Sequence, residues 1–183
     1  MNARVFVLLP VLSALILSSC KEVTFSEPQP RGVASIAEIP ASLRGSYIAS
    51  DPTEDKKDTL IIESWGYHFR DSKDKDWLGK GVISDSLVVK YYKDYYFVNF
   101  RADKRWVLRL VKRQPSGSID FLSLNVQDEE KENDLIPKLS KSVEVKRNEV
   151  NGDIFYEINP SRDQLMAFIQ KGYFTGIVLE KKR

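Results

Sequence analysis

The sequence predicts an α+β fold, mainly β, in which an antiparallel meander sheet is joined by one C-terminal helix. From Leu43 onward, apolar residues alternate with polar ones in short runs bounded by turn residues, which is the period of half-buried strands. After Asn159-Pro160, the apolar spacing changes to that of a helix. These patterns leave two arrangements of the sheet open, a sandwich and a partly closed barrel, with the helix packed on the sheet or across one end.

The first strand of this sheet is expected at residues 43–48. Its Gly45-Ser46-Tyr47 step is loosely similar to the Gly-x-Trp entry of lipocalin-type barrels, where glycine permits close packing at the barrel floor. The resemblance implies a lipocalin-like form for the partly closed barrel. The charged segment 51–58 is expected to be an exposed loop before the strand-forming run 59–70.

The best-defined hairpin spans residues 86–101, with Lys93-Asp94 as a tight turn. This register makes one face entirely apolar, because it pairs Tyr91 with Tyr96, Val89 with Val98 and Leu87 with Phe100. A three-residue loop at 103–105 then leads to a strand at 106–111, placing Leu108 opposite Phe100 and Leu110 opposite Val98. A turn at 114–117 precedes a fourth strand at 119–126.

The C-terminal third is mixed. Residues 127–139 are charged and predict a short helix or a loop that ends near Pro137. Asn151-Gly152 is a strong hairpin signal between strands at 143–150 and 153–158. Ser161 and Gln164 form a capping box for the C-terminal helix, Gly172 ends it, and a last strand follows at 174–180.

The N-terminus has the pattern of a secretory signal. Arg4 supplies a positive charge, and residues 5–17 are almost wholly apolar. A transmembrane helix is the competing interpretation, but a span needs roughly 20 apolar residues and this run is shorter. We therefore expect residues 1–19 to be removed.

The end of the apolar run, Leu17-Ser18-Ser19-Cys20, resembles the lipobox of bacterial lipoproteins. The resemblance implies cleavage before Cys20, a thioether link from Cys20 to a diacylglyceryl group, and acylation of the new amino terminus. The alternative is an ordinary signal peptide with a chance cysteine. Cys20 is the only cysteine of the chain and stands where a lipobox requires it.

Residues 20–38 are then expected to form the lipidated cysteine and a flexible tether, and residues 39–183 a single β-rich domain. The cysteine followed by Glu27-Pro28-Gln29-Pro30 resembles small lipoproteins of Bacteroidota, in which such a linker precedes a compact domain of unknown function. By analogy with enteric sorting, where aspartate after the cysteine favours inner-membrane retention, Lys21 points to the outer membrane, on its periplasmic or surface face.

The composition argues against most catalytic and metal chemistry. His68 is the only histidine, and lipidation of Cys20 removes the only thiol, so neither a His/Cys metal site nor a cofactor site is expected. No nucleophile-elbow or phosphate-loop motif occurs, and we expect no enzyme, although paired carboxylates remain open. The formal net charge of +2 gives no reason to expect a nucleic-acid partner.

One candidate ligand-binding strip follows from the hairpin register, on the face opposite the apolar one. It is cationic and aromatic, and its residues are Lys90, Tyr92, Tyr95, Phe97, Arg101, Arg109 and Arg113. In this register Arg109 lies opposite Asn99, and Arg113 lies beside Tyr95. The alternatives are a solvated outer face and a face covered by the C-terminal helix.

Three functions follow from these expectations. The first is a membrane-anchored, non-catalytic binding module for a small amphiphilic or anionic ligand. The second is a structural or assembly lipoprotein that docks another envelope protein. The third is an enzyme, for which the sequence offers no motif.

Overall fold

The computed structural model describes residues 20–50, 57–70 and 79–182. The predicted signal peptide, and all of the predicted 51–58 loop except its last two residues, lie outside the described residues. The described part forms one connected, mostly antiparallel sheet and two helices. Its elements are β1 Lys21–Phe25, β2 Gly45–Ser50, β3 Lys57–Glu63, β4 Gly66–Phe69, β5 Lys80–Val82, β6 Leu87–Tyr92, β7 Tyr95–Ala102, β8 Arg105–Arg113, β9 Ile119–Ser123, α1 Glu129–Ser140, β10 Val145–Val150, β11 Asp153–Ile158, α2 Arg162–Gln170 and β12 Thr175–Lys181.

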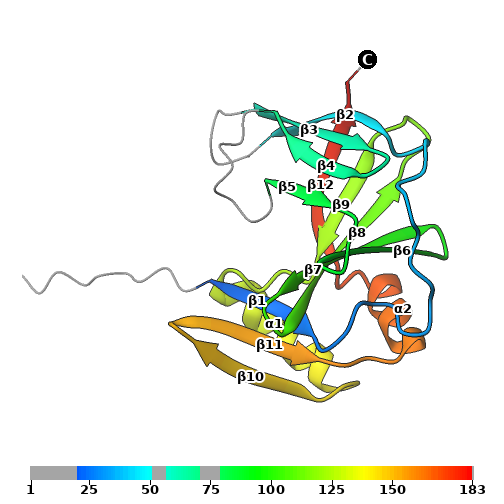
Figure 1. Ribbon diagram of the computed structural model, residues 1–183. Coiled ribbons are helices and arrows are strands. Elements are labelled where there is room, and N and C mark those ends of the chain that lie inside the picture. Colours follow the sequence, from blue (N-terminus) through cyan, green and yellow to red (C-terminus); the bar gives the residue numbers. More distant parts are fainter. Residues whose placement is uncertain (1–19, 51–56, 71–78, 183) are drawn as a thin grey trace, which may run out of the picture.

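The sheet branches at β8. One edge of β8 pairs with β7, which pairs with β6. On the other edge, Trp106 and Val107 pair with β1, whereas residues 110–113 pair with β9. The β1 branch continues to β11 and β10, and the β9 branch continues through β12, β2, β3 and β4 to β5, so the two branches diverge below and above β8 in Figure 1. The predicted α+β, mainly β fold class is confirmed, as one open and curved sheet.

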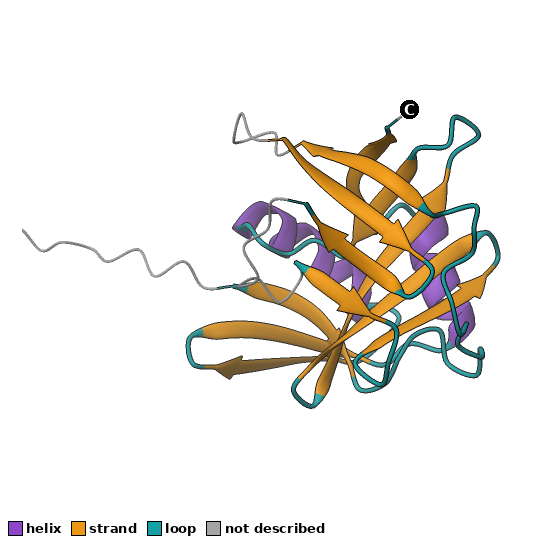
Figure 2. Cartoon of the chain, turned by 45° about the horizontal axis from the view of Figure 1, so that its top comes forward, coloured by secondary structure: helices purple, strands orange, loops and turns teal. Residues whose placement is uncertain are grey.

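The two faces of the sheet bury separate cores. Figure 2 shows both helices on the same side of the sheet. Leu135 and Leu139 of α1, and Leu165 and Phe168 of α2, pack on this side against buried residues of β1, β7, β8 and β11. A second core lies on the opposite, concave side, among residues of β2, β3, β8, β9 and β12. We call the first side the helix-covered face and the second the concave face.

Three local predictions are confirmed. The β6–β7 hairpin has the expected register, with Leu87 opposite Phe100 and Tyr91 opposite Tyr96. Asn151 and Gly152 turn between β10 and β11 with φ of 54° and 90°, the left-handed values that a type I′ turn requires. The capping box at the start of α2 is present, since the Ser161 side chain accepts from the Gln164 backbone and the Gln164 side chain accepts in return.

The predicted register between β7 and β8 is wrong by one residue. The turn has two residues, Asp103 and Lys104, so that Val98 lies opposite Arg109 and Phe100 lies opposite Val107. Leu108 and Leu110 therefore point to the helix-covered face. The sequence could not reveal this, because β8 has apolar residues on both of its faces and either register buries an apolar set.

Two further predictions are corrected. The helix α1 does not end near Pro137 but continues to Ser140, and Pro137 occupies its last turns. The expected flexible tether begins with a strand instead: β1 is parallel to β11 and antiparallel to β8, and Val23 and Phe25 are buried in the helix-covered core. The domain therefore starts at Lys21 and not at residue 39.

The segment after β1 is also held in place. The Asn99 side chain accepts the backbone N–H of Gln29 at 2.7 Å and donates to the Gln29 carbonyl at 2.9 Å. Both residues are fully buried and cannot reach water. These two hydrogen bonds therefore satisfy the Asn99 amide and the Gln29 backbone in place of water. Within the described residues, no helix is long and apolar enough to cross a membrane.

Candidate ligand-binding cavity

The strip predicted from the sequence does not form one surface. Its residues Lys90, Tyr92, Tyr95 and Phe97 lie on the helix-covered face, where Phe97 is fully buried and the two tyrosines pack against the core. The Lys90 ammonium donates to the carbonyls of Pro28 at 2.8 Å and Pro30 at 3.0 Å. Burial lowers the pKa of Lys90. The alternative that the C-terminal helix covers this face therefore holds for Tyr92, Tyr95 and Phe97, whereas residues 28–30 cover Lys90.

The three arginines of the strip do not lie together. Arg101 stays on β7, whereas the two arginines of β8 lie on the opposite face of the sheet. Arg101 is exposed and lies 6.0 Å from the Trp106 ring. Arg109 and Arg113 lie on the concave face, and not on the face of the predicted strip, because the register of β8 differs from the predicted one by one residue. Arg109 forms a bidentate ion pair with Glu22 of β1, with its two nitrogens 2.7 and 3.2 Å from the carboxylate oxygens. This ion pair joins two strands, and the seven predicted residues do not lie together on one surface.

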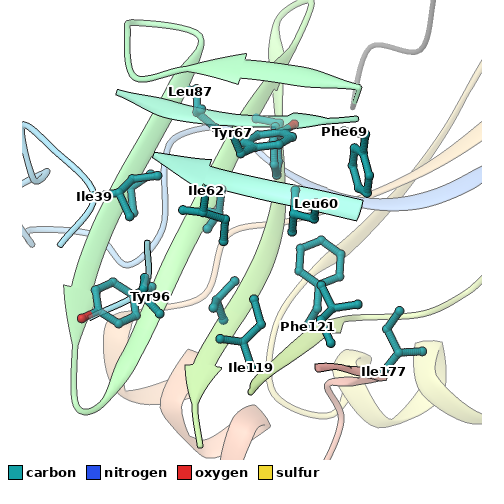
Figure 3. A pocket seen from close by; sticks show the side chains of 16 residues that line it. Ile39, Leu60, Ile62, Tyr67, Phe69, Leu87, Tyr96, Ile119, Phe121 and Ile177 are labelled. Atoms are coloured by element: carbon teal, nitrogen blue, oxygen red, sulfur yellow. The ribbon is translucent and has the colours of Figure 1, made fainter. Parts of the chain in front are cut away.

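The concave face contains an apolar cavity of about 180 Å³. Sixteen residues line it, and Figure 3 shows Leu60 and Ile62 of β3 facing Ile119 and Phe121 of β9. The lining residues are Ile39, Leu43, Leu60, Ile62, Tyr67, Phe69, Leu87, Val89, Tyr96, Val98, Phe100, Val111, Ile119, Phe121, Ile177 and Leu179.

The curvature of the sheet builds this cavity. Strands β4, β3, β2, β12, β9, β8, β7 and β6 are consecutive neighbours in this order, and their inward-facing residues meet because the sheet bends around its concave face. Alternation along each strand puts Val89, Val98 and Val111 on the inside. The sequence pattern of a half-buried strand is therefore the pattern that lines the cavity.

A non-strand segment spans the space between β6 and the β3–β4 turn. The backbone N–H of Ile36 donates to the Val89 carbonyl of β6, and that of Ile39 donates to the Ser64 carbonyl in the turn, both at 2.8 Å. The Ile39 side chain enters the cavity. Residues 36–38 were predicted to belong to the tether and are instead held against β6, and Ile39, predicted as the first residue of the domain, is part of the cavity wall.

The cavity offers almost no polar groups. Among its sixteen lining residues only Tyr67 and Tyr96 have a polar side-chain atom. Burial raises the pKa of Tyr67 to about 12, and Arg109 offsets this rise in part. The Tyr67 hydroxyl is therefore neutral at physiological pH, where it can donate or accept one hydrogen bond.

Size and chemistry define what this cavity can hold. An engineered apolar cavity of roughly 150 Å³ stays free of water and binds benzene. The cavity on the concave face is of similar size and has an exposed residue, Ile177, in its lining. It can accept a short apolar group and cannot stabilise an ion, because burying a charge without a partner is strongly unfavourable.

Other chemistry finds little support in the part of the chain that the structure describes. There, no group of three or more His, Cys, Asp or Glu side chains is placed to hold a metal ion. The His68 ring stacks on Trp65 at 5.9 Å, and its Nδ1 lies 4.0 Å from a Glu63 carboxylate oxygen. These contacts hold His68 between an aromatic ring and a carboxylate.

The apolar residues of the β6–β7 hairpin that line the cavity are predicted by the sequence, but the cavity is not. The sequence predicts one entirely apolar face for the β6–β7 hairpin and places the candidate ligand-binding strip on the opposite face. A filled core and a cavity use the same residue types, so hydrophobic periodicity cannot distinguish them. No protein-family model, curated protein or solved structure matches this chain.

Proposed function

We propose that this protein is a non-catalytic binding module for an amphiphilic ligand, anchored to a membrane through acyl groups on Cys20. The apolar part of the ligand would occupy the concave-face cavity, and its polar part would remain outside. The observation that carries this proposal is the exclusively aliphatic and aromatic lining of a cavity that includes the exposed Ile177. Burial of apolar surface stabilises such a complex by about 0.8 kcal/mol for each methylene group.

The anchor is proposed from the lipobox resemblance at Cys20, which is exposed at the start of the described chain. Its location in the outer membrane is proposed from Lys21 by analogy with enteric sorting. A lipid-anchored domain with an apolar cavity would sample amphiphiles at the membrane where they are concentrated. In this function the protein binds its ligand and does not convert it.

Binding of decanoate, measured by isothermal titration calorimetry, tests the cavity. Val98→Phe would place a ring in the cavity from a partly buried position on β7, and we expect it to weaken decanoate binding at least about tenfold, or about 1.4 kcal/mol. The matched control is Val178→Phe, because Val178 is 59% exposed and does not line the cavity. The control should bind decanoate like the wild type.

A second matched pair serves if the buried phenylalanine unfolds the protein. Ile177 and Val178 are adjacent on β12 and both exposed, but only Ile177 lines the cavity. Ile177→Gln should weaken decanoate binding and Val178→Gln should not. Failure of the wild type to bind decanoate, or equal binding by both members of a pair, would contradict the proposal.

A further inference from the structure

The sheet begins directly at the cysteine that we propose to be acylated. The backbone N–H of Cys20 donates to a carboxylate oxygen of Asp153 at 2.9 Å, and its carbonyl accepts from the N–H of Ile154 at 2.9 Å. The next residue, Lys21, is already part of β1. No residue therefore separates Cys20 from the folded domain.

Strand β1 cannot supply a tether by leaving the sheet. It pairs with β11 on one edge and with β8 on the other. Val23, Thr24 and Phe25 are buried, and Lys21 forms an ion pair with Glu132 of α1. Detachment of β1 would expose apolar side chains and break the Glu22–Arg109 ion pair, so the strand remains in place.

Acylation of Cys20 is compatible with this geometry. An N-acylated cysteine keeps one N–H, because acylation converts the amine to an amide. The hydrogen bond to Asp153 is therefore retained after the modification. The Cys20 side chain is exposed, so a thioether substituent meets no buried group.

The parallel pairing of β1 and β11 defines which end of the domain lies beside the anchor. Lys21 lies opposite Ile154, and β11 runs from there to Ile158, which is followed by α2. In Figure 1 the start of β1 lies beside the turn between β10 and β11, and α2 lies at the other end of these strands. The near end, which we call the anchor end, consists of Cys20, Val150, Asn151, Gly152 and Asp153.

We propose that the anchor end lies against the lipid headgroups, so that the domain has a defined orientation on the membrane. This inference rests on the proposed acylation of Cys20. One residue spans at most about 3.6 Å, and the interfacial layer on each side of a bilayer is roughly 5–8 Å thick. The anchor end cannot lie farther from the lipids than these lengths allow. The far end of β11 is about 17 Å away, at roughly 3.3 Å for each step between its residues.

The composition of the anchor end is consistent with contact at a headgroup layer. Asn151 and Gly152 are exposed, and Val150 is an exposed apolar residue at 40%. Val150 lies in the strand pair directly opposite Asp153. A small apolar side chain beside polar turn residues can contact the interface without entering the hydrocarbon.

Fluorescence quenching on vesicles tests the orientation. The full chain is isolated in its acylated form and placed on phosphatidylcholine vesicles that carry a spin label on the headgroup. Because Cys20 is the only cysteine, Val150→Cys and Asp163→Cys each give one labelling site in the acylated protein. Asp163 is exposed in the first turn of α2, at the far end of β11.

We expect headgroup quenching at position 150 to be at least about threefold stronger than at position 163. A variant with about ten Gly and Ser residues inserted after Cys20 should lose this difference while remaining on the vesicles, because such a linker has a root-mean-square length of about 17 Å. Equal quenching at the two positions, or no effect of the insertion, would overturn the orientation. A protein that does not float with vesicles and takes up label at Cys20 would overturn the anchor as well, and decanoate binding would still report on the cavity separately.

Discussion

Replacement of Arg109 by methionine removes the cation of the ion pair that joins β8 to β1. The Arg109 and Glu22 side chains are 13% and 12% exposed, and their closest nitrogen and oxygen are 2.7 Å apart. At an effective dielectric constant of about 20, this separation corresponds to an attraction of about 6 kcal/mol before desolvation. Desolvation of the two charges offsets most of it, and we expect a net coupling of about 2 kcal/mol.

Urea unfolding of a double-mutant cycle measures that coupling. Arg109→Met and Glu22→Gln should each lower the free energy of unfolding by about 3 kcal/mol. Each variant leaves one buried charge without its partner, the Glu22 carboxylate in the first and the Arg109 guanidinium in the second. The double variant should lose about 2 kcal/mol less than the two single losses added together. Additivity within about 0.5 kcal/mol would refute this reasoning and free Arg109 for the ligand role that the sequence suggested.

Three further perturbations test the fold and the cavity wall. Asn99→Ala should lower the free energy of unfolding by about 2–3 kcal/mol in urea, because it leaves the buried backbone N–H and carbonyl of Gln29 without the Asn99 side chain. The control Asn148→Ala should change the free energy of unfolding by less than about 0.5 kcal/mol, and similar losses in the two variants would contradict the role of Asn99. Ser161→Ala should cost about 1 kcal/mol in thermal unfolding and Ser161→Asp should not, and equal losses would argue against the cap. Burial raises the pKa of Tyr67 from 10.0 to about 12, so the unfolded chain loses this proton first and stability falls as pH rises from 10 to 12; Tyr67→Phe should reduce that fall in urea midpoints, and an unchanged fall would contradict the burial of its hydroxyl.

Local signals in the sequence predicted local structure well. Asn151-Gly152 can form its turn with little help from the rest of the chain, and the Ser161 capping box likewise needs only residues of its own helix. The β6–β7 register was predictable because a two-residue turn and one apolar face agree on the same pairing. These are the features that short-range geometry determines.

Features that depend on distant partners were not predictable in the same way. β1 has only five residues and is bounded by charges and prolines, and it is a strand because β11 and β8 provide edges on both sides. The observed register of β8 brings Arg109 to Glu22, which lies 87 positions away in the chain. Arg109 and Arg113 are not on the face of the predicted ligand strip for that reason, because a shift of one residue moves a side chain to the other face.

The cavity itself depends on curvature, which no short window of sequence encodes. Bending brings Leu60 and Ile119 to the same cavity although their strands are separated in the sheet by β2 and β12. Each lining residue is an ordinary inward-facing position of its strand. Their shared function follows only from the shape that the whole sheet adopts.

The most direct test of the proposed function is an isotope-edited nuclear Overhauser measurement on the protein with bound decanoate. We predict contacts between the alkyl protons of decanoate and the methyl groups of Leu87, Ile119 and Leu179, which come from three different strands around the cavity. Contacts confined to Leu165 or other residues of the helix-covered face, or no contacts to the lining methyl groups at saturating decanoate, would contradict the account.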